Sequence, residues 1–260
     1  MKTELLLQRT TVYTDFQSAE SFSSPGLYLL GISYDASTSF RPGARNGPLA
    51  LREASVNLEV YSPYLDKELT DEDIAHRLFD LGNLSFTANN FQGQKEQFEE
   101  LTDGGLDLST MRLLTLGGEH SISIMPLTAY LKHFPDLLII HLDAHADLRH
   151  ELYGDTNSHA CVMRRTTELF GDHHALLQYG IRSGTKEEFQ WMKEHKTLAT
   201  SRSSFLSIIK DIPPDRPLYL TLDLDFFDPS LVSGTGTPEP GGEDFHCFIS
   251  LLKILKDKNL

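Results

Sequence analysis

The chain has 260 residues, of which 40% are hydrophobic and 10% aromatic, and its formal net charge is −14. This composition is typical of a folded globular protein, and the length predicts a single domain over residues 1–260. The negative charge argues against binding to nucleic acid or to an anionic membrane surface.

Short apolar runs alternate with longer stretches of helical pattern, which is typical of β-α units around a parallel sheet. In chain order, we expect strands at 27–33, 77–82, 112–116, 137–142, 175–181 and 217–222, with a weaker one near 197–200. We expect helices at 47–60, 92–103, 121–133, 158–170, 185–195, 203–209 and 243–257. This order of elements predicts an α/β domain with a central, mostly parallel sheet.

The cysteines and the apolar runs favour a cytoplasmic protein. Cys161 and Cys247 lie in no C-x-x-C pair and cannot form a disulfide framework, which indicates reduced thiols. The N-terminus has three consecutive leucines among charged residues, which is too short and too charged for a signal peptide. No apolar run approaches the ~20 residues that a membrane-spanning helix needs.

Polar residues follow three of the expected strands directly. Strand 112–116 leads into Gly-Gly-Glu-His120, strand 137–142 into Asp143-Ala-His145-Ala-Asp147, and strand 217–222 into Asp223-Leu-Asp225. In open α/β sheets, ligands bind at the carboxyl ends of the strands. The sequence therefore predicts a functional site at this edge of the sheet.

Alternation along an extended segment places Asp143, His145 and Asp147 on one side. Such convergence after a buried strand is costly unless the groups bind cations, although an isolated D-x-H-x-D pattern fits a solvated turn equally well. The two carboxylates of Asp223 and Asp225 would repel each other unless cations lie between them. A lone histidine such as His120 is most often an ordinary polar residue.

Together these segments supply four aspartates and two histidines, enough to share two metal ions. Oxygen and imidazole ligands without a thiolate suit Mn²⁺, with Fe²⁺, Co²⁺, Ni²⁺ or Zn²⁺ as alternatives. Two such ions can share one water molecule and lower its pKa towards neutrality, which makes it a nucleophile.

Five segments resemble successive signatures of the ureohydrolase (arginase/agmatinase) family: GGEHSIS (117–123), DAHADLR (143–149), SHACVMRR (158–165), DLDFFDP (223–229) and GTGTPEPGG (234–242). The segment GISYDASTSFRPGARNGPLALREAS (31–55) is similar to the family's opening strand, loop and helix. The resemblance spans roughly residues 27–242 and implies a three-layer α-β-α, arginase-like fold. It also implies metal-dependent hydrolysis of a cationic guanidinium compound to urea and an amine.

The resemblance assigns roles to individual residues. Of two Mn²⁺ ions, one would be held by His120, Asp143, Asp147 and Asp223, and the other by His145, Asp143, Asp223 and Asp225. Asp147 would also orient the attacking hydroxide, and His159 would protonate the leaving amine. Glu239 would pair with the guanidinium group. The simpler interpretations are an exposed loop glutamate for Glu239 and a surface histidine for His159.

The segments after the D-x-H-x-D motif are more like those of bacterial and archaeal agmatinases than those of arginases. This implies agmatine as the substrate, with putrescine and urea as products. Arginine and guanidinobutyrate are the alternative substrates. Glu151 or Asp155 could bind a distal ammonium group, or either could be a solvated loop acid.

The chain departs from the family at its end, because the last helical pattern reaches Leu260 where family members continue into another strand and helix. We therefore expect the sheet to lack the family's last strand. A truncated, inactive homologue is a second hypothesis. An arginase-like deacetylase with one Zn²⁺ is a third, disfavoured by its motif spacing. The resemblance also implies a homotrimer or homohexamer.

Overall fold

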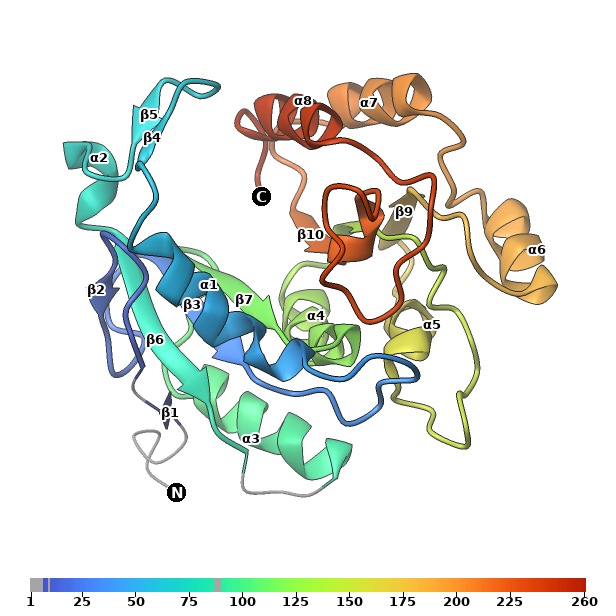
Figure 1. The fold of residues 1–260 in the computed structure, drawn as a ribbon, viewed down its shortest axis with the longest axis horizontal. Coiled ribbons are helices and arrows are strands. Elements are labelled where there is room, and N and C mark those ends of the chain that lie inside the picture. Colours follow the sequence, from blue (N-terminus) through green and yellow to red (C-terminus); the bar gives the residue numbers. More distant parts are fainter. Residues whose placement is uncertain (1–6, 9, 87–89) are drawn as a thin grey trace. The chain divides into compact units, whose positions relative to one another are not determined.

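The computed structural model describes residues 7–8, 10–86 and 90–260 (Figure 1). These residues form two compact units, each with its own sheet. The first unit comprises the chain up to Ala36 together with Pro42–Met125, and the second comprises Ser37–Arg41 and Pro126–Leu260. The single domain expected over the whole chain stays a prediction.

The sheet of the first unit has the strand order β1-β6-β3-β7, with β2 also paired to β6. Its strands are β1 (Leu7–Gln8), β2 (Gln17–Ser18), β3 (Gly26–Ile32), β6 (Leu78–Leu84) and β7 (Met111–Gly117). The central strand β3 is parallel to both β6 and β7, and its register with β7 runs from Gly26 opposite Met111 to Ile32 opposite Gly117. This register brings the carboxyl ends of β3 and β7 to the same edge.

Helices and short elements complete the first unit: α1 (Gly47–Ser55), α2 (Glu72–Ala75), α3 (Phe91–Asp103), the 3-10 turns η2 (Ala44–Asn46) and η3 (His120–Ser123), and the hairpin β4 (Tyr61–Ser62) with β5 (Lys67–Glu68). A fully buried ion pair joins α1 to β6, since Arg52 donates at 2.8 Å to both carboxylate oxygens of Asp80. The same guanidinium donates to Asn83 Oδ1 at 2.8 Å.

The second unit has a parallel sheet of three strands in the order β10-β8-β9. The strands are β8 (Leu138–Leu142), β9 (Ala175–Tyr179) and β10 (Leu218–Leu222). The remaining elements are α4 (Ile124–His133), which begins in the first unit, η4 (His159–Cys161), α5 (Val162–Thr167), α6 (Lys186–His195), α7 (Arg202–Asp211), η5 (Leu224–Phe226) and α8 (Phe245–Leu255). The register aligns Leu142 with both Leu222 and Tyr179, so all three strands end together.

The core of the second unit lies between this sheet and helices α7 and α8, which lie side by side (Figure 1). It contains Ile140 and Leu142 of β8, Phe205 and Ile209 of α7, and Leu251 and Leu255 of α8. Side-chain caps begin the helices around it: Thr185 and Glu188 form a capping box at α6, and Asp244 caps α8 by accepting from the Cys247 N–H at 2.7 Å.

The six main strands expected from the sequence are present, whereas the weak one near 197–200 is a single bridge between Leu198 and Gln178. The expected helix 47–60 ends at Ser55, and the helix expected at 158–170 is a 3-10 turn followed by α5. Within the described residues, β7 pairs with β3 in the first unit and β10 pairs with β8 in the second. No helix in this part of the chain is long and apolar enough to cross a membrane.

Candidate metal centre and active-site pocket

A carboxylate and imidazole cluster forms at the carboxyl end of β8 in the second unit. Ligand atoms of His141, Asp143 and Asp147 lie within 4.8 Å of one another, and so do those of Asp143, His145 and Asp225. All of these side chains except His145 are at least nine-tenths buried. Because Asp143 belongs to both groups, it is the residue best placed to serve two cations.

The second group is held together by direct contacts between loops far apart in the sequence. His145 Nδ1 lies 3.1 Å from Asp225 Oδ2 and 3.5 Å from Asp143 Oδ1. The backbone N–H of Ala144 donates to Asp225 Oδ1 at 3.1 Å. These contacts join the ends of β8 and β10.

The backbone turns sharply at Asp147, whose φ of 53° lies in the left-handed region. Two N–H groups at the start of α5, those of Met163 and Arg164, donate to the Asp147 carbonyl at 2.9 and 3.1 Å. The next N–H, of Leu148, donates to the buried Glu188 at 3.0 Å. The expected alternation of side chains along an extended backbone therefore ends at Asp147, because its carbonyl accepts hydrogen bonds from the N–H groups at the start of α5.

The electrostatics of the cluster favour a bound positive charge. Burial disfavours the charged form of His145, but hydrogen bonds and negative charge from Asp143 and Asp225 outweigh it and raise the pKa of His145 to about 11. Burial and the nearby charge of Asp143 raise the pKa of Asp225 to about 6, against the opposing effect of His145. A bound cation would relieve the repulsion between these buried carboxylates.

Asp223 and His120 were also predicted as ligands. Asp223 is half-buried, and its Oδ1 accepts the Asp225 N–H at 3.0 Å. It belongs to neither ligand group found among the described residues of the second unit. His120 is a buried residue of the first unit, where it begins η3 directly after β7.

Two residues, Gly118 and Glu119, connect β7 to His120. A Cβ at Gly118 would lie only 2.0 Å from the Tyr34 carbonyl oxygen, and the N–H of Glu119 donates to that same oxygen at 2.8 Å. Gly118 is therefore required by a close backbone approach.

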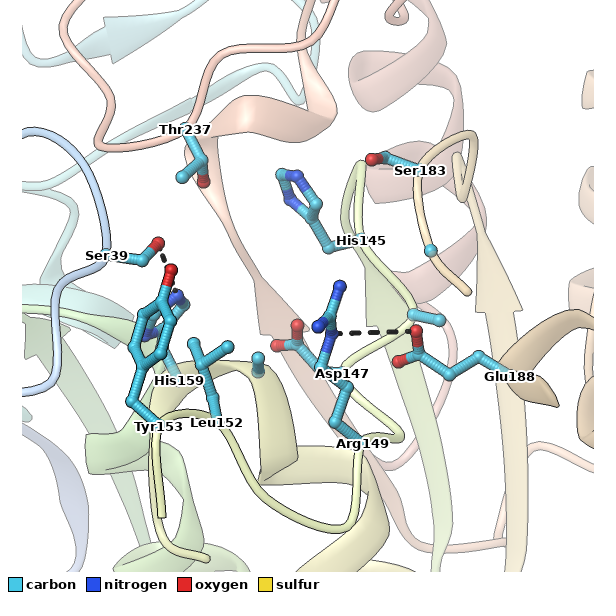
Figure 2. A pocket seen from close by; sticks show the side chains of 13 residues that line it. Ser39, His145, Asp147, Arg149, Leu152, Tyr153, His159, Ser183, Glu188 and Thr237 are labelled. Atoms are coloured by element: carbon cyan, nitrogen blue, oxygen red, sulfur yellow. Dashed lines mark hydrogen bonds and ion pairs between the residues drawn. The ribbon is translucent and has the colours of Figure 1, made fainter. Parts of the chain in front are cut away.

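A pocket of about 290 Å³ opens beside the cluster, entirely within the second unit (Figure 2). Its lining includes Ser39, His145, Asp147, Arg149, Leu152, Tyr153, His159, Ser183, Glu188 and Thr237. The predicted proton donor His159 is held by two serines, with Ser37 Oγ 3.3 Å from Nδ1 and Ser39 Oγ 3.3 Å from Nε2. The structure thus brings His145, Asp147 and His159 to one pocket.

The other predicted substrate contacts lie outside this lining. Glu239 Oε1 is 3.7 Å from His145 Nε2, and its side chain is 37% exposed. Glu151 and Asp155 are exposed, and Asp155 accepts the Asn157 N–H at 2.8 Å in a local turn. A different acid, the buried Glu188, lines the pocket, 3.9 Å from Arg149 Nε.

A family model described as the arginase family matches residues 26–260. The chain belongs to the arginase family. It is 41% identical over 217 residues to an agmatinase of Bacillus subtilis, covering 82% of this chain and 72% of that protein. It is 35% identical over 236 residues to the N(1)-aminopropylagmatine ureohydrolase of Thermococcus kodakarensis, covering 88% and 77%.

Two solved structures share the fold of this chain. The proclavaminate amidino hydrolase of Streptomyces clavuligerus superimposes with a TM-score of 0.82 at 24% identity, covering 97% of this chain and 86% of that one. The arginase of Medicago truncatula gives 0.75 at 26% identity, covering 88% and 75%. The predicted family, its agmatinase-like character and the arginase-like α/β fold are confirmed.

Four further residues that support the arginase-family site were not predicted from the sequence: His141, Gln178, Arg182 and Glu188. The sequence could have indicated His141, because this residue of β8 lies two positions before Asp143 and therefore shares its side of the sheet. Arg182 donates to the backbone carbonyls of Asp225 and Glu239, more than 40 residues away. No local pattern identifies such a partner.

Proposed function

We propose that the chain hydrolyses agmatine to putrescine and urea in the pocket of the second unit. The proposal is supported by the agmatinase relatives and by one observation above all, the convergence of His145, Asp147 and His159 on a single pocket. A guanidinium group reaching this pocket would meet the carboxylate and imidazole cluster directly.

The donor set fits divalent cations, because among the described residues it consists of carboxylates and imidazoles. We assign one ion to Asp143, Asp147, Asp223 and His120 and the other to Asp143, His145, Asp223 and Asp225, with Mn²⁺ as the metal. When bound, two such ions make water a nucleophile at neutral pH. His120, Asp223 and the identity of the metal are the parts of this assignment that rest on the family resemblance.

Glu239 is the proposed acceptor for the substrate guanidinium. Its backbone carbonyl accepts a hydrogen bond of 2.8 Å from Arg182, which fixes the loop while leaving the carboxylate available. A carboxylate matches the planar N–H fork of a guanidinium group. Asp147, on the pocket wall, would accept a hydrogen bond from the attacking water and orient it.

His159 is the proposed general acid. As the oxygen of water bonds to the guanidinium carbon, the water gives up its two protons, the carbon–nitrogen bond to the putrescine nitrogen breaks, and that nitrogen takes a proton from His159. The protons given up by the water restore the proton of His159 and complete the ammonium group of putrescine. The hydroxyl groups of Ser37 and Ser39 can each donate or accept, so they hold the ring both before and after proton transfer. This arrangement suits a group that changes charge once in each turnover.

Three other expectations remain proposals: Glu151 or Asp155 as contacts for the distal ammonium, a cytoplasmic location, and, from the family resemblance, a homotrimer or homohexamer. In addition to these predicted residues, the buried carboxylate of Glu188 lines the pocket.

Urea release tests the function. The purified chain with Mn²⁺ is assayed with agmatine, arginine, guanidinobutyrate and N(1)-aminopropylagmatine, and agmatine is expected to give the highest kcat/KM. A preference for one of the other three compounds would refute the agmatine assignment while keeping the reaction. Absence of urea from all four would support the hypothesis of an inactive homologue.

A further inference from the structure

A buried polar network runs from Thr197 through Gln178 to His141, a residue of the cluster to which the proposed function assigns no metal ion. His141 and Gln178 are 0% exposed and Thr197 is 6% exposed. His141 Nε2 lies 2.9 Å from Asp143 Oδ2, and Gln178 Nε2 lies 3.1 Å from His141 Nδ1. Thr197 Oγ1 donates to Gln178 Oε1 at 2.9 Å.

The direction of each hydrogen bond follows from one acceptor, the backbone carbonyl of Ala146. A carbonyl oxygen can only accept, so the amide nitrogen of Gln178 must be the atom that faces it at 3.0 Å. The second N–H of that nitrogen then points to His141 Nδ1, which must accept. Nε2 of His141 therefore carries a hydrogen and donates a hydrogen bond to Asp143.

We propose that Thr197, Gln178 and His141 are positioning residues that orient the Asp143 carboxylate and thereby set the affinity of the cluster for divalent cations. The inference rests on the proposed metal centre. His141 contacts Asp143 Oδ2 and the backbone N–H of His145 donates to Asp143 Oδ1 at 2.6 Å, so hydrogen bonds at both oxygens fix the plane of the carboxylate. Outer hydrogen-bond partners of metal ligands typically change metal affinity by about 10- to 100-fold.

Gln178 has a second effect, on the backbone that carries the other ligands. Ala146 lies between His145 and Asp147, so the hydrogen bond from Gln178 holds the loop from which both side chains project. Both amide hydrogens and the amide oxygen of Gln178 are in use. A network satisfied in this way is rigid, because any rotation of the amide would break three hydrogen bonds.

Direct measurement of Mn²⁺ affinity tests the proposal without relying on urea release. Calorimetry on the metal-stripped full chain measures the dissociation constant for Mn²⁺ in the wild type and in four variants: His141→Phe, His141→Gln, Gln178→Met and Thr197→Val. His141→Phe removes the hydrogen-bond donor to Asp143, and Gln178→Met removes the amide that orients the His141 ring. Each should weaken Mn²⁺ binding about 10- to 100-fold. His141→Gln keeps an N–H near the position of Nε2 and should recover most of the affinity. Thr197→Val should weaken binding a few-fold.

Thr166→Val is the matched control, because Thr166 is also buried and its hydroxyl donates to the Val162 carbonyl inside helix α5. It should leave the dissociation constant unchanged. Equal affinities for Thr197→Val and Thr166→Val would overturn the proposal even if His141→Phe fails to fold. Variants that lower the melting temperature of the metal-free protein at unchanged affinity would also overturn it, since the network would then be structural only. A different substrate preference would refute the proposed function and leave this test intact.

Discussion

The guanidinium group of Arg182 donates a hydrogen bond of 2.6 Å to the backbone carbonyl of Asp225. The same nitrogen, Nη2, donates to the Glu239 carbonyl at 2.8 Å, and Nε donates to the Pro240 carbonyl at 3.1 Å. One side chain thus joins the loop of a proposed metal ligand to the loop of the proposed guanidinium acceptor.

We predict that Arg182→Lys lowers kcat/KM for agmatine by about 10- to 100-fold, because an ammonium group cannot replace a planar fork that bonds several carbonyls. Arg216→Lys is the control, since Arg216 also bonds two backbone carbonyls, those of Asp136 and His173, but neither of these residues is a proposed metal ligand or substrate contact. Steady-state urea assays compare the two variants. Equal activity in both would show that the fork of Arg182 does not position the site.

The strands were predictable from sequence because apolar runs between polar turns dominate the signal, as in LLIIHL, which forms β8. The two-residue strands β1, β2, β4 and β5 were missed since so short a segment has no measurable period. Helix ends were also misplaced. The expected helix at 158–170 is broken at its start because the Met163 and Arg164 N–H groups bind the Asp147 carbonyl.

The site was predictable as far as local chemistry reached. The spacing of Asp143 and His145 and the pair ending in Asp225 indicated a cluster, and the structure places these three together. The supports of the cluster were not predictable, because they depend on contacts such as that from the Ala144 N–H to Asp225, 81 residues away. Which acid lines the pocket also depends on tertiary structure: Glu188 does so, whereas Glu151 does not.

Metal removal should lower the stability of the protein. Treatment with a chelator is expected to lower the melting temperature, and Mn²⁺ at 100 times its dissociation constant should restore about 2.7 kcal/mol. Asp225→Asn should abolish most of this gain because it removes a carboxylate from the cluster. Asp172→Asn, at an exposed turn, should keep the full gain. Thermal melts with and without Mn²⁺ would contradict the metal centre if the wild type gained nothing.

Asp228 should stabilise the loop from Phe227 to Gly242 in a pH-dependent way. The hydroxyl and N–H of Ser230, with the N–H groups of Gly241 and Gly242, lower the pKa of Asp228 to about 2 against a small opposing effect of burial. A carboxyl whose folded pKa lies below its unfolded value of about 3.9 stabilises the fold above that value. This contribution is lost as the pH falls through 2.

The difference in unfolding free energy between the wild type and Asp228→Asn should therefore be constant above about pH 4 and shrink as the pH approaches 2. Denaturant titrations at several pH values measure it. Ser230→Ala removes the largest cause of the shift and should raise the pKa of Asp228, which narrows the pH range over which the difference changes. If the difference in unfolding free energy between the wild type and Asp228→Asn did not change with pH, titration of Asp228 would not contribute to the stability of the fold.

Breaking the ion pair of Arg52 and Asp80 should strongly lower the stability of the first unit. Both side chains are buried, so Arg52→Met leaves an uncompensated carboxylate and should cost about 3–5 kcal/mol. Arg45→Met removes a comparable pair with Asp35, at 3.4 Å, but the Arg45 side chain is 62% exposed, so the loss should stay below about 1 kcal/mol. Similar losses in the two variants, measured by denaturant unfolding, would show that burial does not govern this pair.

Replacing His159 should separate chemistry from binding. His159→Gln removes the proposed proton donor, so kcat for agmatine is expected to fall by about 10²- to 10⁴-fold, the usual contribution of a general acid. KM and Mn²⁺ affinity should change little, because Glu239 is the proposed guanidinium acceptor and the cluster is untouched. His174→Gln is the control, since this ring also uses both nitrogens, with the Gly171 N–H and the Phe134 carbonyl at 2.8 Å, but lies outside the pocket lining. If His159→Gln retained the kcat of this control, the leaving amine would have to take its proton from another group.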